Sequence, residues 1–469
     1  MTKLTLAIDF GSTYTKVVAF DLVAEQLVGV AQAVSTVDTD ITIGLRTALE
    51  KLRMVIGGGK LDADRILACS SAAGGLRIVA AGLVRQLTTK AAEEAALGAG
   101  AKIVGTYSYG LSPEDIGRIE KTAPDIVLLT GGTDGGDDKV ILHNAVALAA
   151  CKLSSPVVIA GNKIVAQKAQ SLLRAANKYA TVIENVLPEL DRLNVEPARV
   201  AIRDIFMQRI THAKGLDKAQ ALVGDIIMPT PMAVLKGATL LAQGTGEESG
   251  LGDLIIVDVG GATTDVHSVG YGHPSRQGVV VKGLPEPYVK RTVEGDLGIR
   301  YNARSILEIT GKKQIMEKMV FSNSPLAENI DLDASIEYLS GHIGAIPQSE
   351  EQYSIDIGLA SVAVDIATQR HAGKIEEMYF PTGKVWIQYG KDLTKTKCVI
   401  GTGGIFAYGQ EPRSILRTAC YNQNNPMSLR PMNPECFVDE RYILYAVGLL
   451  AEVAPREALR IMKRHLKSV

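Results

Sequence analysis

Two short stretches carry the residue types from which a phosphate and metal site can be built. Residues 9–16 read DFGSTYTK, and residues 258–265 read DVGGATTD. In each stretch an aspartate ends an apolar run and is followed by glycine and small hydroxyl residues. Glycine lets backbone N–H groups approach anionic oxygens closely. The pattern therefore predicts two phosphate-binding turns, one in each half of the chain.

The presence of carboxylates in phosphate-binding turns needs a separate explanation, because an aspartate side chain repels phosphate. Mg²⁺ is commonly held by one or two carboxylates together with phosphate oxygens. Asp9 and Asp258 are therefore the expected metal ligands and the candidate catalytic residues, and Asp265 is a weaker metal candidate. Asp258 is the candidate for orienting an attacking water, through the metal or directly. The expected phosphate-binding residues are Gly11, Ser12, Thr13 and Lys16 in the first turn, and Gly260, Gly261, Ala262, Thr263 and Thr264 in the second.

A third glycine motif, VIGTGGIFAY at residues 399–408, follows a strand-like run in the second half. Its small residues Gly401, Thr402, Gly403 and Gly404 would let a base and ribose lie against the backbone. A single Asp-Gly turn also has a purely structural interpretation, because hairpins use such turns for backbone reasons alone. The pair of turns, with the third motif in order, favours ATP or ADP bound with Mg²⁺.

The elements that would position these motifs form an α/β pattern. Residues 3–9 and 15–21 predict a β-hairpin around the first turn, and the same strand–turn–strand pattern recurs at 254–269. Strand-like runs at 125–129, 156–161 and 181–185 alternate with helical segments, which predicts parallel pairing. Ser112, Pro113 and Asp115 predict a capped helix start.

This organisation predicts two duplicated α/β domains that flank a nucleotide cleft. We expect domain I at 1–245, with an inserted α/β subdomain at about 57–200. We expect domain II at 246–435, with the Gly-rich segment 243–253 as the linker. C-terminal helices at 436–469 would return to domain I.

Composition excludes several classes of protein. The formal net charge is −1 and 46% of the 469 residues are hydrophobic, which indicates sizeable cores and argues against a nucleic-acid partner. No apolar stretch reads as a signal peptide or membrane span. The five cysteines show no CxxC spacing, so reduced thiols and a cytoplasmic location fit better than disulfides or zinc.

The ordered motifs resemble those of the actin, hexokinase and heat-shock-chaperone ATPase superfamily. DFGSTYTK and DVGGATTD resemble its two phosphate motifs, and IGTGG resembles its adenosine motif. TPMAVLKGATLLA (230–242) and YAVGLLAE (445–452) resemble its two connecting helices. The resemblance implies an actin-like ATPase fold.

A closer resemblance covers nearly the whole chain. ACSSAAGGLRIVAAGLV (68–84), LLTGGTDGGD (128–137) and DVGGATTDVHSV look like the glutamate mutase L (MutL, GlmL) family, which is unrelated to the mismatch-repair protein of the same name. This family is associated with adenosylcobalamin-dependent mutases. The implied role is an accessory chaperone or reactivating factor, a slow ATPase that releases damaged cobalamin from glutamate mutase or an aminomutase. A homodimer is compatible with this role.

Other interpretations stay open at this point. A small-molecule kinase on the same fold is the main alternative, although no motif places a base carboxylate for an acceptor hydroxyl. An iron–sulfur ATPase activator and a filament-forming assembly protein are two more. One departure bears on hydrolysis: the chaperone relatives have an acidic residue before the proline of the first connecting helix, and here Thr230 precedes Pro231.

The remaining motifs have structural interpretations. GGTDGG (131–136) reads as a tight loop, although it could bind an anion or contact a partner. CSSAAGG (69–75) reads as a packed turn more readily than as a nucleophile loop. Trp386 is expected in a core strand, and the basic segment 456–467 is expected to be a solvated helix face.

Overall fold

The computed structural model describes residues 4–11, 13–36, 39–58, 61–71, 76–206, 223, 226–320, 330–381 and 383–469. The chain divides into two compact units. Unit 1 comprises Met1–Leu22, Leu27–Val234 and Gly283–Pro287, and unit 2 comprises Val23–Gln26, Leu235–Lys282 and Tyr288–Val469. The three-part domain division expected from the sequence stays a prediction.

The first sheet of unit 1 has the strand order β10-β4-β1-β2-β3. Strand β1 pairs antiparallel with β2 and parallel with β4, and β4 pairs parallel with β10, so the predicted N-terminal hairpin is confirmed. Alternate apolar residues of β1 pack with the buried face of α1, as strand alternation requires. The elements are β1 (Leu4–Phe10), β2 (Tyr14–Asp21), β3 (Gln26–Val34), α1 (Ile41–Val55), β4 (Ala63–Ser70) and β10 (Ile226–Pro229).

The second sheet of unit 1 has the order β6-β5-β7-β8-β9, with every pair parallel. One face packs against α3, α4 and α5, and the other against α2 and α6. This confirms the predicted parallel α/β layers. The elements are β5 (Leu76–Gly82), η1 (Arg85–Thr89), α2 (Lys90–Gly98), β6 (Ala101–Ser108), α3 (Pro113–Thr122), β7 (Ile126–Leu129), α4 (Lys139–Ala150), β8 (Val157–Ile159), α5 (Lys163–Ala175), β9 (Ala180–Val182) and α6 (Glu196–Ile205).

Local hydrogen bonds in this part match two predictions. The capping box of α3 is present, with the Ser112 hydroxyl accepting from the Asp115 N–H and the Asp115 carboxylate accepting from the Ser112 N–H. The GGTDGG segment is a tight loop, since the Gly136 N–H donates to the Thr133 carbonyl and the Asn162 amide bonds the loop backbone on both sides.

Unit 2 is built around the sheet β14-β12-β11-β17-β18-β19. Helices α10, α11 and α12 supply the apolar residues that cover one face of β11 and β12. The elements are α9 (Thr230–Gln243), whose first turn belongs to unit 1, β11 (Leu254–Val259), β12 (Thr264–Val269), β14 (Val289–Glu294), α10 (Ala303–Lys318), α11 (Leu332–Gly341), α12 (Glu350–His371), β17 (Cys398–Thr402), α13 (Gly404–Tyr408), α14 (Pro412–Arg417), β18 (Glu435–Asp439), α15 (Leu444–Leu450), α16 (Pro455–Arg464) and β19 (Leu466–Ser468).

The main sheets of the two units repeat one topology. In unit 1, β1 lies between its antiparallel hairpin partner β2 and the parallel strands β4 and β10. In unit 2, β11 lies between its antiparallel partner β12 and the parallel strands β17 and β18. A third strand, β3 or β14, extends each hairpin at the sheet edge. The predicted α/β fold with two duplicated halves is therefore confirmed.

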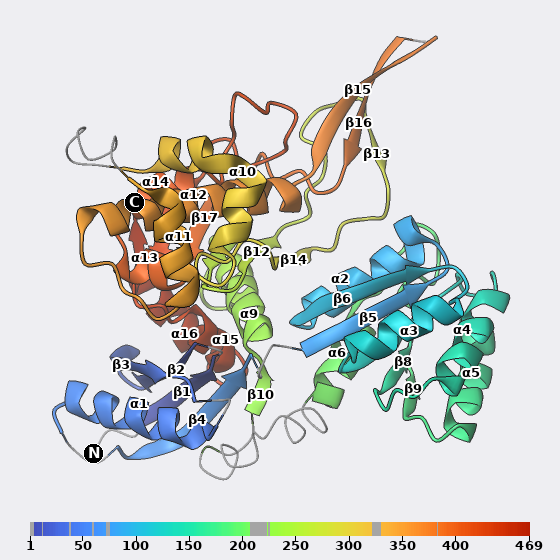
Figure 1. Ribbon diagram of the computed structural model, residues 1–469, viewed down its shortest axis with the longest axis horizontal. Helices are drawn as coiled ribbons and strands as arrows, with labels where there is room; N and C mark the ends of the chain where they lie inside the picture. Colours follow the sequence, from blue (N-terminus) through green and yellow to red (C-terminus); the bar gives the residue numbers. More distant parts are fainter. Residues whose placement is uncertain are drawn as a thin grey trace. The chain divides into compact units, whose positions relative to one another are not determined.

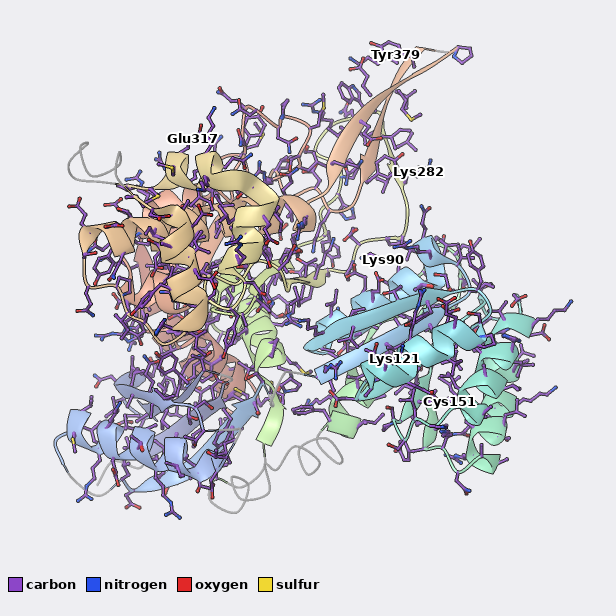
Figure 2. All side chains as sticks on the ribbon, in the orientation of Figure 1. Lys90, Lys121, Cys151, Lys282, Glu317 and Tyr379 are labelled. Carbon is purple, nitrogen blue, oxygen red and sulfur yellow. The ribbon has the colours of Figure 1, made fainter. Side chains whose placement is uncertain are left out.

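A separate three-stranded sheet in unit 2 has the order β13-β16-β15 (Figure 1). Its strands are β13 (Val279–Lys282), β15 (Lys374–Phe380) and β16 (Gly383–Tyr389). Trp386 lies in a strand, as predicted, but its expected core position is wrong, because it is only partly buried and carries Arg276 and Lys384 over its ring. Tyr379 on β15 is exposed on this sheet (Figure 2).

The basic segment near the C-terminus forms α16, as predicted, and its cations are paired with acidic side chains. Arg460 binds both Glu25, in the turn before β3, and Glu248. Lys463 also binds Glu248. None of the helices in the described ranges has the length and hydropathy that crossing a bilayer requires.

Helices α9 and α15 meet through small residues. A Cβ atom at Gly237 of α9 would lie 2.7 Å from the Leu444 carbonyl oxygen and 3.3 Å from the Gly448 nitrogen of α15. No side chain fits there without movement of backbone. The close approach of the two helices therefore depends on glycine at position 237.

We expect Gly237→Ala to lower the free energy of unfolding of unit 2 by about 1–3 kcal/mol, the usual cost of overpacking. Gly117→Ala in α3 is the matched control, because a Cβ there meets no atom within 4 Å. That control should gain up to about 1 kcal/mol from helix propensity. Urea unfolding of both variants tests this, and equal stabilisation by the two changes would contradict it.

Candidate functional site

The first Asp-Gly turn joins β1 to β2 and is closed by one backbone hydrogen bond. The Gly11 N–H donates to the Tyr14 carbonyl at 3.2 Å. A Cβ atom at Gly11 would lie 2.6 Å from that carbonyl oxygen, so the turn requires glycine. Gly11 and Thr13 are partly exposed. Ser12 lies outside the described residues, and its predicted role stays a prediction.

Asp9 lies at the end of β1, on the sheet face opposite α1. Its side chain is 1% exposed and its two carboxylate oxygens are separately engaged. Lys16 Nζ donates to Oδ2 at 3.1 Å, and the Thr230 hydroxyl donates to Oδ1 at 2.6 Å. The structure thus brings together Asp9 and Lys16, which face each other across the hairpin.

Thr230 and Cys69 complete the surroundings of Asp9, and the sequence analysis did not place either there. Cys69 lies beside Asp9 on the parallel strand β4, with its Sγ 3.7 Å from Asp9 Oδ1. Burial, followed by the neighbouring Asp9 charge, raises the pKa of the Cys69 thiol well above its ordinary value. Thr230 is the first residue of α9. No local sequence pattern predicts these contacts, because they join the ends of strands and a helix that are far apart in the sequence.

The second turn has the same geometry. The Gly260 N–H donates to the Thr263 carbonyl at 2.9 Å, and Asp258 faces Asp265 across the hairpin as Asp9 faces Lys16. The carbonyl groups of the turn are bonded to the segment that precedes α10. These bonds are Ile299 N–H to Gly260, Arg300 N–H and Tyr301 N–H to Gly261, and the Asn302 amide to Ala262.

This arrangement leaves the donors of the second turn available. Among the hydrogen bonds between described residues, the N–H groups of Gly261, Ala262 and Thr263 have no acceptor. The segment behind the turn is held by a partly buried, bidentate ion pair between Arg300 and Asp356, at 2.8 and 2.6 Å. A turn whose N–H groups are not used within the protein supplies the donors that an anion requires.

The aspartates of the second turn differ in their surroundings. Asp258 is partly exposed. Asp265 is buried, and its Oδ2 accepts from Arg291 Nη2 at 2.7 Å. The Thr264 hydroxyl is also buried and donates to the Leu297 carbonyl at 2.7 Å, so its proton is already used within the protein. Its predicted phosphate contact stays a prediction.

The third glycine motif lies directly beside Asp258. Strand β17 runs parallel to β11, with Thr402 as the neighbour of Asp258. Gly403 has φ 108°, and a Cβ there would lie 3.2 Å from Asp258 Oδ1. Gly404 opens α13, and a Cβ atom there would meet nothing within 4 Å, whereas a Cβ at Gly401 would clash with the Phe406 ring. The structure therefore brings Asp258 and the motif around Gly403 together within unit 2.

Asp439 is a buried residue of this region that the sequence analysis missed. Its carboxylate accepts from the Thr402 hydroxyl at 3.0 Å and from the N–H groups of Ile443 and Leu444 at the start of α15. Burial raises the pKa of Asp439. Its position at the end of the apolar run CFVD, before a helix, is the signal that could have found it.

The metal ligands expected from the sequence stay predictions. Within the described ranges, no three His, Cys, Asp or Glu side chains gather in a group that could hold a metal by itself. Mg²⁺ is often held by one or two carboxylates together with phosphate oxygens and water, so the expected roles of Asp9 and Asp258 do not require such a group.

We expect Thr230→Val to lower the free energy of unfolding of unit 1 by about 1.5–3 kcal/mol, because it removes a hydrogen bond to a buried carboxylate. Thr230→Ser keeps the hydroxyl and is the control. Urea unfolding measures both. If the valine variant is as stable as the serine variant, the Thr230–Asp9 bond does not contribute to stability.

Comparison with known proteins gives consistent results at the level of sequence. The MutL protein family matches residues 5–466. Protein MutL of Clostridium tetanomorphum is 47% identical over 464 residues, covering 99% of each chain.

Solved structures give looser similarities. A gluconate kinase from Lactobacillus acidophilus aligns over 100% of this chain and 93% of its own, at 9% identity and a TM-score of 0.35. A xylulose kinase from Bifidobacterium adolescentis aligns over 100% and 94%, at 12% identity and a TM-score of 0.30. At these TM-scores, the duplicated strand order of the chain itself is what supports the fold class. The sequence matches settle the family: the chain belongs to the MutL (glutamate mutase L) family.

Proposed function

We propose that the protein is an ATP-dependent accessory chaperone that reactivates an adenosylcobalamin-dependent mutase, with glutamate mutase as the client. Membership of the MutL family supports the accessory role. One observation carries the nucleotide part of the proposal: the second Asp-Gly turn has its carbonyls bonded behind it and its N–H groups at Gly261, Ala262 and Thr263 unused.

The residues of the two turns have distinct tasks in this proposal. The N–H groups of the second turn bind phosphate oxygens, and the backbone at Gly403 and Gly404 lies against the adenosine. Lys16 neutralises phosphate charge in the first turn while it remains close to Asp9. Asp9 and Asp258 would hold Mg²⁺, which would neutralise charge at the phosphates. Positioning and such charge stabilisation are most of what phosphoryl transfer needs.

In this proposal ATP hydrolysis is slow, because the residue before Pro231 is a threonine and not an acidic residue that could act as a general base. The Thr230 hydroxyl donates its only proton to Asp9, so it orients that carboxylate and does not activate water. Asp258 remains the group that orients the attacking water. A slow ATPase suits a switch, since each nucleotide state must last long enough for the partner to respond.

The accessory role follows from linkage between two binding events. Adenosylcobalamin enzymes work through radicals, and loss of the adenosyl group leaves damaged cofactor bound. The factor can loosen its client only if its ATP and ADP states differ in affinity for the client. The free energy for cofactor release then comes from exchange of nucleotide.

Calorimetry tests the nucleotide part. We expect ATP and ADP to bind only weakly without Mg²⁺ and more tightly with it. Asp9→Ala and Asp258→Ala should each weaken Mg²⁺-dependent binding by roughly 10- to 100-fold, the equivalent of one charge-assisted contact. Without Mg²⁺, Asp258→Ala should bind ATP at least as well as the parent, because a repulsive charge is gone.

Asp191→Ala, at an exposed loop position, is the charge-matched control and should leave binding unchanged. Circular dichroism shows whether each variant is folded. Unchanged affinity in both the Asp9 and Asp258 variants would remove the proposed site. No nucleotide binding by folded parent protein would remove the ATPase part of the function while leaving a protein-binding role to be tested.

A reactivation assay tests the accessory role. Glutamate mutase inactivated by turnover should regain activity when this protein, MgATP and fresh adenosylcobalamin are added together. Asp258→Ala should fail to restore it, because the nucleotide states are no longer distinguished. Activity and released cobalamin are measured in parallel.

Two outcomes would count against this role. Equal recovery with and without MgATP would show that nucleotide does not drive release. ATP consumption that depends on an added sugar or polyol would support the small-molecule kinase in its place.

A further inference from the structure

The small sheet β13-β16-β15 has an open strand at one edge. In the part of the chain that the structure describes, β13 has one strand neighbour, β16. Its central residues Val280 and Val281 are 54% and 51% exposed, and Lys282 at its end is also exposed (Figure 2). An edge strand presents unpaired backbone N–H and C=O groups, to which another strand can be added. The outer side of β13 is therefore a place where an extended segment can bind.

The strand register places one aromatic ring on each face of this sheet. Trp386 of β16 lies beside Val279 of β13, and Tyr389 lies beside Lys282. Successive side chains of a strand point to opposite faces, so two residues that are three positions apart lie on opposite faces. Trp386 and Tyr389 therefore lie on different faces, and both belong to the strand that borders β13.

Each of these rings has two cations over it. A cation at such a distance is attracted by the electron-rich face of the ring, which helps to hold the charged side chain in place. The distances to the ring centre are 5.3 Å for Arg276 and 4.6 Å for Lys384 at Trp386, and 5.8 Å for Lys282 and 5.5 Å for Lys374 at Tyr389.

The two cations on each face differ in their ion pairing. Lys374 and Lys384 each bind a glutamate of β15, at 2.5 and 2.6 Å. Among the described residues, no carboxylate forms an ion pair with Arg276 or Lys282. Lys282 belongs to β13, and Arg276 lies in the segment that directly precedes this strand. The unpaired positive charges thus flank the open edge, one on each face.

We propose that the outer edge of β13 is a docking site for an extended, acidic segment of a partner protein, which adds to the sheet as a fourth strand. Backbone hydrogen bonds to β13 supply affinity, as in other cases of strand addition. Carboxylates of the segment pair with Lys282 on one face and with Arg276 on the other. The site uses no residue assigned to nucleotide binding, so the inference stands whether or not the proposed function is correct.

The spacing of the two cations specifies the segment. Arg276 lies over the ring that neighbours Val279, and Lys282 is three positions farther along β13. The exposed Val280 and Val281 lie between these two rows and favour apolar partners, which a protein segment has and a nucleic-acid backbone lacks. A strand paired with β13 meets both cations when two apolar residues separate its carboxylates, because this spacing sends one carboxylate to each face. The predicted pattern is acidic–apolar–apolar–acidic.

Fluorescence anisotropy of a fluorescein-labelled TEVVET peptide with the full-length protein tests this. We expect saturable binding that weakens as salt is added. A TEVEVT peptide has the same composition but carries both carboxylates on one face, so it should bind roughly two- to fivefold more weakly, the worth of one exposed ion pair. N-methylation of both valines of TEVVET keeps the charges but removes a backbone donor from each edge of the peptide, and it should abolish binding.

Charge reversal in the protein tests the two cations separately. Lys282→Glu and Arg276→Glu should each weaken TEVVET binding by roughly three- to tenfold, because an attraction becomes a repulsion. Lys282→Arg keeps the charge and should bind like the parent. Lys313→Glu, at a side chain of α10 that is 88% exposed, is the charge-matched control and should also bind like the parent. Circular dichroism verifies that each variant is folded.

Several results would overturn the proposal. The parent protein could bind TEVVET no better than TEVEVT or not at all, or both charge reversals could leave the affinity unchanged. Single-stranded oligothymidylate that binds more tightly than TEVVET, and is lost in the same variants, would assign the surface to nucleic acid. A dimer of the parent in sedimentation that Lys282→Glu dissociates would assign the open edge to a second copy of this chain.

Discussion

The hydrogen bond from a glycine N–H to the carbonyl three residues later is the constraint on which both halves of the protein depend. It closes the turn after Gly11 in one unit and the turn after Gly260 in the other. Because it fixes the register of each hairpin, it sets which residues face each other across the strands. Asp9 and Asp258 consequently occupy equivalent positions, each at the end of a central strand and on the face away from the helix layer.

The side chains around Asp9 and Asp258 differ, although the two aspartates occupy equivalent backbone positions. Opposite Asp9 stands Lys16, a cation that pairs with it directly, whereas Asp258 faces Asp265, which is paired with Arg291. On the parallel side, Asp9 has Cys69 as its neighbour and Asp258 has Thr402. The first carboxylate is therefore enclosed and neutralised within its own unit, and the second is partly exposed. The duplicated backbone thus carries two sites of unequal charge and access.

The sequence predicts those parts of the structure that depend on residues close together along the chain. The Asp-Gly hairpins, the capping box at Ser112 and the alternating parallel strands depend on residues a few positions apart, and each is present. The contact between Thr230 and Asp9 depends on where β10 ends beside β4, which no local pattern encodes. The same holds for the segment 297–302 that bonds the carbonyls of the second turn, and for the β13-β16-β15 sheet. Trp386 was placed wrongly because a strand-like, aromatic-rich pattern does not distinguish a core strand from one in a small, solvated sheet.

The buried Asp439 connects the third glycine motif to helix α15. One buried carboxylate holds the Thr402 hydroxyl on one side and the first N–H groups of α15 on the other. Separating them would break hydrogen bonds of a buried carboxyl group, at about 0.5–1.5 kcal/mol each. The glycine turn after β17 and the start of helix α15 are therefore held together by one side chain, and α15 is the helix whose Leu444 carbonyl lies against Gly237 of α9. The third glycine motif and the α9–α15 crossing are thus linked, within unit 2, by a continuous series of hydrogen bonds and close backbone contacts.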